Sequence, residues 1–277
     1  MALDYLPSES LQPVVGIHAA LRSVASRDRY LAATCGSQPG DGWMPLEDLP
    51  QWIDAHMQVA AGIYGTSDRR ALTAMLLLTY GWCLAAPAIA SYLLEAKVPR
   101  MVGNISLRAA GGGLEVTYLR DEGAVLASDP ASVLPGAVGL RDGEELRAWL
   151  REELMNSFGP VVSGLADVSP FRERTLWGML ADRWGDVCVW VGRVTSTLDT
   201  SLQEGQKLLG APGVPWRRVP EFVYLERDGR GQPFLLRTTC CLHYKLPGGR
   251  HCSTCPLLPE DERERRMLAD LSSEALA

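Results

Sequence analysis

Four of the seven cysteines lie close together near the C-terminal end, and their spacing constrains the fold more than any other feature. Cys240, Cys241, Cys252 and Cys255 form a C-C-x10-C-x2-C pattern. Four thiolates in one loop can complete an iron–sulfur cluster, so we expect this loop to fold around a metal centre. The C-x-x-C turn places two sulfurs close enough to chelate one centre. Vicinal cysteines in an extended chain point to opposite sides and more naturally serve two iron atoms.

Zinc and free thiols are the alternatives to an iron–sulfur cluster. Structural zinc sites usually combine two spaced Cys or His pairs around one tetrahedral ion, whereas one pair here is vicinal. Cys252 and Cys255 alone could form a redox-active C-x-x-C motif. His243 and His251 could each replace a cysteine ligand, but with four thiols available we interpret them as polar neighbours.

Composition and charge restrict the partners and the compartment. The 277 residues, 47% of them hydrophobic, suffice for one large domain or two small ones. A net charge of -6 gives no support to an extended phosphate-binding surface, so we expect no nucleic-acid partner. Asp4 and Glu9 are atypical of an export signal, and a single cysteine cluster suits a reducing cytosol. We therefore predict a cytoplasmic protein in which the scattered cysteines are small buried hydrophobic residues, namely Cys35, Cys83 and Cys188.

Residues 71–94 contain no charged side chain and are long enough to span a bilayer. Gly81 and Pro87 interrupt this stretch, and it has neither a polybasic flank nor a second span to accompany it. We therefore expect no transmembrane segment. The prediction is instead two buried helices that meet near Ala86 and Pro87.

The hydrophobic pattern predicts an α+β fold with a mainly helical body. Apolar residues at three and four spacing predict helices over residues 46–94, 144–165 and 170–193. Ser169 is the expected N-cap of the last of these helices. The Pro, Gly, Ser and Asp content of residues 122–143 predicts a loop, which is the best internal boundary.

Two hairpins are expected. Residues 104–110 and 114–119 alternate apolar and polar side chains on either side of a glycine run. The second has an Asp228-Gly229 turn between residues 221–226 and 233–238, and its second strand leads directly into the cysteine loop.

A C-terminal helix is expected after Pro259, because acids there precede arginines in the order that a helix dipole favours. The predicted organisation has three parts. Residues 1–122 are a helical region with a hairpin, residues 143–220 are a helical region of the same body, and residues 221–277 hold the second hairpin, the cluster loop and the helix.

The cysteine spacing, preceded by a strand with Arg237, resembles the ferric siderophore reductases of the FhuF family. The flanking residues, from Cys240 to Tyr244 and from Cys252 to Pro256, are similar to that family's cluster-binding tail, and the likeness covers about the last 40 residues. Upstream, the Leu176-Trp177-Gly178 triplet is more weakly similar to the family's main domain. The resemblance implies an oxidoreductase with a [2Fe–2S] cluster on the four cysteines.

The resemblance further implies that the protein binds an imported ferric siderophore of the hydroxamate type and reduces its iron. Siderophores hold Fe(III) with hard oxygen donors, which hold Fe(II) far less well, so reduction releases the iron. The sequence shows no Ser-His-Asp, HExxH or phosphate-loop pattern, and electron transfer needs none. The sequence shows no flavin or nicotinamide site, so we expect an external electron donor, either a ferredoxin or a flavin reductase.

Candidate substrate contacts lie around the cysteine loop. Lys245 and Arg250 are the only charged residues between Cys240 and Pro256. With two cations there and an acidic chain overall, we favour hydroxamates over strongly anionic catecholates. Trp177 could pack on the methylene arms of the chelator. The alternatives are a siderophore-binding protein with a structural zinc staple and an iron–sulfur sensor.

Overall fold

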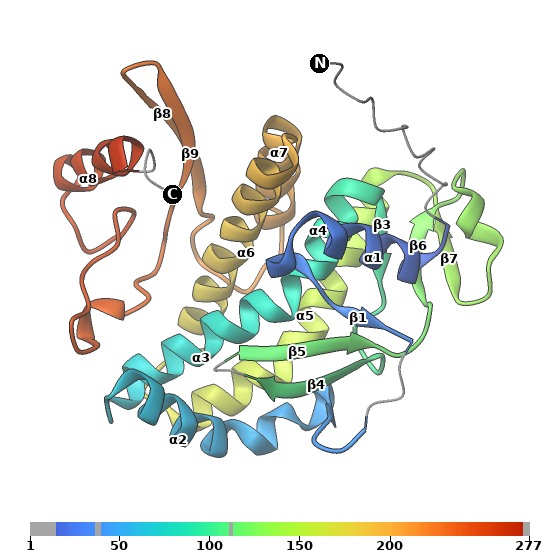
Figure 1. Cartoon of the computed structure of the whole chain (residues 1–277), viewed down its shortest axis with the longest axis horizontal. Helices are drawn as coiled ribbons and strands as arrows, with labels where there is room; N and C mark the ends of the chain where they lie inside the picture. The colour runs from blue at the N-terminus through green and yellow to red at the C-terminus, as the bar shows by residue number, and fades with distance from the viewer. Residues whose placement is uncertain (1–14, 37–39, 111–112, 274–277) are drawn as a thin grey trace, which may run out of the picture.

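The computed structural model describes residues 15–36, 40–110 and 113–273, and it combines a helical body with small sheets (Figure 1). This arrangement confirms the α+β prediction. The N-terminal residues Asp4 and Glu9 and the turn glycines Gly111 and Gly112 lie outside the described residues.

The centre of the body is α6 (Glu173–Thr195), which packs against α3 (Arg69–Cys83), α4 (Ala85–Glu95) and α5 (Gly143–Val168). Trp184 of α6 is 1% exposed, and its ring makes edge contacts with Phe158, Trp177 and Trp216 at centroid distances of 5.5, 6.4 and 5.9 Å. Burying aromatic rings of this size contributes strongly to core stability. The remaining body helices are α1 (Ile17–Arg27), α2 (Ile53–Tyr64) and α7 (Leu198–Leu209), with a 3₁₀ helix at Leu46–Trp52.

Helices α3 and α4 account for the uncharged stretch. Together, Arg69–Glu95 is long and apolar enough to cross a membrane by length and composition, but 78% of its most apolar window is buried inside the fold. Packing in the core therefore explains its composition. The helices meet at Leu84, close to the predicted junction near Ala86 and Pro87. Pro87 therefore lies in the first turn of α4, where its missing N–H breaks no helical hydrogen bond.

The first hairpin is confirmed. Strands β4 (Ile105–Ala110) and β5 (Gly113–Tyr118) pair antiparallel, with Ile105 opposite Tyr118. Two short strands, β1 (Thr34–Cys35) and β2 (Met44–Pro45), complete a sheet of order β1-β5-β4-β2.

The prediction of a loop over residues 122–143 is wrong in two places. Strands β6 (Gly123–Leu126) and β7 (Ala137–Leu140) pair with each other and, through β6, with β3 (Lys97–Pro99). At Gly123 a Cβ atom would lie 2.1 Å from the carbonyl oxygen of Val98. The glycine therefore marks a close strand-to-strand approach and not a turn.

The boundary between α5 and α6 also differs from the prediction. Ser169 is the C-cap of α5, and α6 begins three residues after Pro170, at Glu173. The Oγ of Ser169 accepts a hydrogen bond from the backbone N–H of Phe171 at 3.4 Å. Such a local side-chain bond suits the turn between two helices as well as a helix start, which is why the serine was ambiguous. Helix α7 was not predicted.

The C-terminal unit, residues 221–273, lies beside α6, with β9 next to the helix (Figure 1). Strands β8 (Glu221–Arg227) and β9 (Arg230–Leu236) form the second predicted hairpin, whose turn residues Asp228 and Gly229 have φ values of 53° and 72°. Two positive φ values are the signature of a type I′ turn. Helix α8 (Glu260–Ser273) confirms the predicted C-terminal helix and covers the hairpin over a small separate core of Phe234, Met267 and Leu271.

Candidate metal centre

The four thiols of the cysteine loop, residues 237–257, are arranged as two pairs. The Sγ atoms of Cys240 and Cys255 lie 3.7 Å apart, and the thiols of Cys241 and Cys252 are hydrogen-bonded to each other. Two sulfurs that share one tetrahedral metal ion at about 2.3 Å are about 3.8 Å apart, so the separation of Cys240 and Cys255 fits a shared ion. Each pair takes one thiol from the vicinal cysteines and one from the C-x-x-C turn.

This pairing refines the expectation from the sequence. The vicinal cysteines do belong to different pairs, but so do the two cysteines of the C-x-x-C turn. Among the residues that the structure describes, no three metal-ligating side chains gather around a single point. A two-and-two arrangement of thiols suits a binuclear cluster, in which each iron takes two protein ligands.

The backbone around the thiols is turned tightly. Leu242 adopts a left-handed conformation with φ of 58°, and its N–H donates to the Sγ of Cys240 at 3.4 Å. The chain then continues into a 3₁₀ turn at His243–Lys245. On the other side of the loop, the N–H of Cys255 donates to the carbonyl of Cys252 at 3.2 Å, which closes the C-x-x-C turn.

The thiols differ in acidity because of their partners. The hydrogen bond from Cys252 lowers the pKa of Cys241 to about 5 and raises the pKa of Cys252. Burial raises the pKa of Cys240 to about 12. Since the thiolate is the ligating form, this hydrogen bond favours a thiolate on one member of the Cys241–Cys252 pair.

Helix α6 holds the start of the cysteine loop. Asp182 is 1% exposed, and its carboxylate accepts hydrogen bonds from the backbone N–H and hydroxyl groups of both Thr238 and Thr239, at 2.5 to 3.1 Å. One turn further along, Asp186 accepts a hydrogen bond from Nη2 of Arg237 at 2.6 Å. These carboxylates fix the two residues immediately before Cys240 and the arginine that precedes them.

Gly178 allows α6 to approach the start of the cysteine loop closely. A Cβ atom at Gly178 would lie 2.7 Å from Cγ2 of Thr239. Gly178, Asp182 and Asp186 are spaced four residues apart and therefore lie on one side of α6. We call these three residues the docking face. Their role was not predicted from the sequence, although two acidic residues four apart in a tryptophan-rich helix were a visible signal.

The Nε–H group of Arg237 is an unpaired hydrogen-bond donor near the cysteine loop. Its Nε atom is buried and has no hydrogen-bond partner among the described residues. Burial alone would lower the pKa of Arg237, but the charges of Asp186, Cys252, Asp182 and Cys241 outweigh burial and hold the pKa above its usual value. Buried N–H groups in native structures are nearly always paired. A group that brings acceptor atoms among the thiols, as the sulfides of an iron–sulfur cluster would, therefore fits this site.

A cavity of about 800 Å³ lies between the helical body and the cysteine loop, and both Cys241 and Cys252 line it. Five arginines and two histidines also line it: Arg183, Arg237, Arg250, Arg265, Arg266, His243 and His251. Four of the arginines share two carboxylates. Asp186 contacts Arg183 and Arg237, and Glu262 contacts Arg265 and Arg266.

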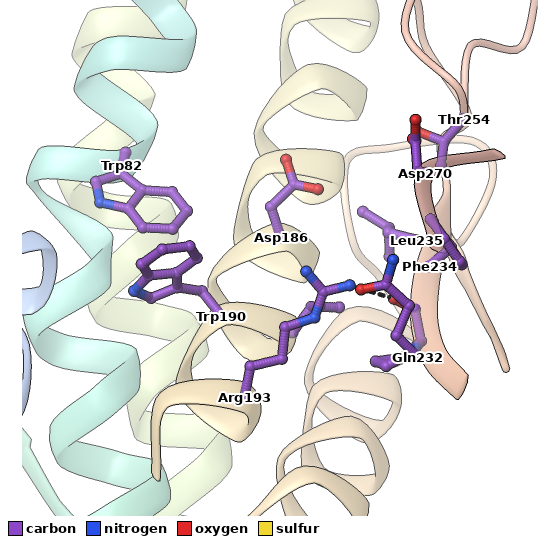
Figure 2. Close-up of a pocket in the computed structure, with 11 residues that line it drawn as sticks. Trp82, Asp186, Trp190, Arg193, Gln232, Phe234, Leu235, Thr254 and Asp270 are labelled. Carbon is purple, nitrogen blue, oxygen red and sulfur yellow. Dashed lines mark hydrogen bonds between the residues drawn. The ribbon is translucent and has the colours of Figure 1, made fainter. Parts of the chain in front are cut away.

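A second pocket, which we call the aromatic compartment, shares a lining residue with this cavity. Figure 2 shows the residues that line the compartment. The compartment has a volume of about 420 Å³, and Asp270 lines both spaces. Trp82 of α3 and Trp190 of α6 form one wall, and residues of β9 together with Thr254 of the C-x-x-C turn form the other. Tyr30 makes an edge contact with Trp190 at a centroid distance of 5.7 Å and extends the aromatic wall.

The three predicted substrate residues lie in three different surroundings. Arg250 lines the cavity beside Cys241. Lys245 is directed to the body, where its Nζ lies 3.5 Å from Asp68. Trp177 is 8% exposed and packs in the core against Trp184. Sequence reasoning missed Trp82. Nothing in the local pattern shows that this tryptophan, at the end of a core helix, lines a pocket instead of being buried.

The cysteine loop matches a known family. The family model of the FhuF 2Fe-2S C-terminal domain matches residues 237–257, from Arg237 through all four cysteines. This match confirms the resemblance to the FhuF family over this segment, and it indicates a [2Fe–2S] cluster. It also suggests an iron–sulfur protein of the siderophore-iron reductase type, with a role in iron acquisition.

Proposed function

We propose that this protein is a ferric siderophore reductase in which Cys240, Cys241, Cys252 and Cys255 ligate the [2Fe–2S] cluster. The observation that carries the proposal is the pair of close thiol contacts beside a cavity large enough for a chelate. When bound, the cluster supplies one-electron transfer. The two-and-two arrangement of thiols supports this cluster over a zinc staple, for which all four thiols would surround one ion.

The electron balance requires two partners. An external donor, either a ferredoxin or a reduced flavin from a flavin reductase, supplies one electron. The ferric chelate accepts one electron, and its Fe(III) becomes Fe(II). Hard oxygen donors hold Fe(II) much less strongly, so the iron dissociates from the siderophore. The protein itself needs no general acid or base for this reaction.

The cavity beside the cysteine loop is the proposed site for the iron-bearing end of the siderophore. Its 800 Å³ lies within the range typical of small-molecule sites. Arg250 is the polar contact that we propose at this end. The aromatic compartment offers Trp82 and Trp190 to the methylene arms of the chelator, the role expected from the sequence for Trp177.

The charge of the cavity supports a hydroxamate substrate. From the sequence only two cations, Lys245 and Arg250, were expected near the cluster, whereas five arginines line the cavity in the structure. Four of them contact Asp186 or Glu262, and Arg250 alone has no acidic partner in the described part of the chain. With the charge of -2 that an oxidised [2Fe–2S] cluster would add, the five arginines are balanced by the cluster and by Asp186, Asp270 and Glu262. A site that is neutral in sum favours a neutral or weakly charged chelate over a strongly anionic catecholate.

The proposal is tested with anaerobically reduced protein. Mixed with a ferric hydroxamate, it should lose its reduced spectrum and yield one trapped Fe(II) per cluster, because each cluster carries one electron. NADPH alone should support no turnover. Arg250→Glu should raise the KM for the hydroxamate several-fold, whereas Lys245→Glu, a matched charge reversal in the same loop, should have little effect.

Two results would contradict this function. A protein that binds the ferric chelate but never reduces it would be a binding protein or a sensor. Faster reduction of a ferric catecholate than of the hydroxamate would show that the cavity selects an anionic chelate.

A further inference from the structure

Arg237 is held in one orientation by the body of the protein. It follows directly after β9, and its Nη2 donates to Oδ2 of Asp186 at 2.6 Å. The side chain is 16% exposed, and Asp186 is also half-buried on α6. An arginine fixed at one nitrogen of its planar group has its remaining N–H directions fixed as well.

One N–H group of the guanidinium lacks a protein partner. The Nε–H of Arg237 is buried and has no acceptor among the described residues. Arg237 lines the same cavity as the proposed ligands Cys241 and Cys252. A buried donor that is left unpaired costs free energy, so a site that retains one is arranged for an acceptor that binds there.

We propose that the Nε–H of Arg237 donates a hydrogen bond to a sulfur of the bound cluster and raises its reduction potential. Asp186 acts as the positioning residue, because it orients the guanidinium. The proposal rests on the ligation by the four cysteines, but not on the identity of the electron acceptor.

The physical reason is the change in charge on reduction. Two Fe(III), two sulfides and four thiolates together carry a charge of -2, and one added electron makes it -3. A fixed cation and an N–H donor at the sulfur stabilise the more negative state more strongly, so they favour reduction. Arginine keeps its charge at any working pH and can bind Asp186 and a sulfur at once through different nitrogens, whereas lysine has a single nitrogen.

The direct test uses the loaded wild-type protein without siderophore. The protein is produced with ¹⁵N-labelled arginine, its cluster is reduced with dithionite, and pulsed electron paramagnetic resonance is recorded. We expect a ¹⁵N coupling and an exchangeable proton coupling to the cluster. Absence of both couplings would overturn the proposal even if every Arg237 variant failed to fold.

Variants then assign the couplings and measure the effect on the potential. In Arg237→Gln both couplings should disappear, and the ratio of reduced to oxidised cluster at a fixed ambient potential should fall about tenfold, which is 59 mV for a one-electron couple. Arg237→Lys should retain part of the potential but lose the ¹⁵N coupling. Arg265→Gln is the matched control, because Arg265 lines the same cavity but its side chain is 67% exposed.

The outcomes separate this inference from the proposals on which it rests. A shift in Arg237→Gln no larger than that in Arg265→Gln, or couplings that survive in Arg237→Gln, would overturn the role of Arg237 while leaving the cluster in place. A wild-type protein with no reducible cluster would overturn the ligation and this inference together.

Discussion

At the residue scale, Asp182 shows how much of the metal centre is determined away from the cysteines. Burial raises the pKa of Asp182, and the hydrogen bonds from Thr238 and Thr239 oppose that rise. Four donors directed at one carboxylate compensate for its removal from water. The carboxylate thereby places Cys240 at a fixed distance from α6 before any metal is bound.

The pairing of the thiols leads to the first residue-scale prediction. Replacing any one of the four cysteines with Ser should weaken the visible bands, because each supplies a proposed ligand. If the pairs of the structure each bind one iron, the spectra of the four variants should fall into two classes: Cys240→Ser with Cys255→Ser, and Cys241→Ser with Cys252→Ser. Absorbance and electron paramagnetic resonance of the reduced variants measure this.

The control is Cys83→Ala, since Cys83 is half-buried in α3 and lies apart from the cysteine loop. Its spectrum should be that of the wild type. A grouping of Cys240→Ser with Cys241→Ser would show that the vicinal thiols share an iron, and a dispensable member of the four would refute the ligand set.

The cysteine loop was predictable from the sequence because its information is local. The C-C-x10-C-x2-C spacing and the residues that follow Cys240 carry the family resemblance without reference to the rest of the chain. The partners Asp182, Asp186 and Gly178 lie more than 50 residues away, and no local pattern connects them with Arg237 and Thr239. Their role depends on tertiary contact, which a single sequence does not reveal.

At the element scale, α6 is both the centre of the core and the support of the metal centre. One side of the helix buries Trp184, and another presents the docking face. The hairpin, helix α8 and the long helices were predicted because their periodicity or turn chemistry is strong. Strands β6 and β7 were missed because four-residue strands rich in glycine and alanine have the composition of a loop. Only their pairing with each other and, through β6, with β3 makes them strands.

The docking face gives an element-scale prediction. Gly178→Ala should favour the helix by about 1 kcal/mol through propensity, but the new Cβ would lie 2.7 Å from Cγ2 of Thr239. Overpacking of this kind costs about 1–3 kcal/mol, so we expect no net gain in stability and faster loss of the cluster to a chelator. Urea unfolding and the decay of the visible bands measure the two effects.

A second substitution separates crowding from any other effect of the alanine. Thr239→Ser removes Cγ2 but keeps the hydroxyl that donates to Asp182 at 2.5 Å. The double variant Gly178→Ala with Thr239→Ser should therefore regain most of the cluster lifetime. If Gly178→Ala alone were more stable than the wild type and kept its cluster equally long, the close packing of α6 on the loop would be refuted.

At the scale of the whole molecule, the C-terminal unit contacts the body through both apolar and polar groups, and Leu246 belongs to the main core. Its own small core of Phe234, Met267 and Leu271 is separate from the main core. The connections to the body include Arg237 with Asp186, Nη2 of Arg193 with the carbonyl of Pro233, and Lys245 with Asp68. The large cavity lies at this same boundary. The cluster is therefore expected to stabilise the part of the molecule with the smallest hydrophobic core.

Removal of the cluster should consequently loosen the C-terminal unit selectively. A metal site that links distant segments contributes its binding free energy to folding, and regions with few apolar contacts open first. In hydrogen exchange followed by mass spectrometry, amides of residues 230–257 should exchange at least tenfold faster in the apo protein than in the loaded protein. Amides of α5, in the main core, should change little. Equal protection of residues 230–257 in both forms would show that the loop is preformed without metal, and a uniform loss across α5 and α6 would show that the body also depends on the cluster.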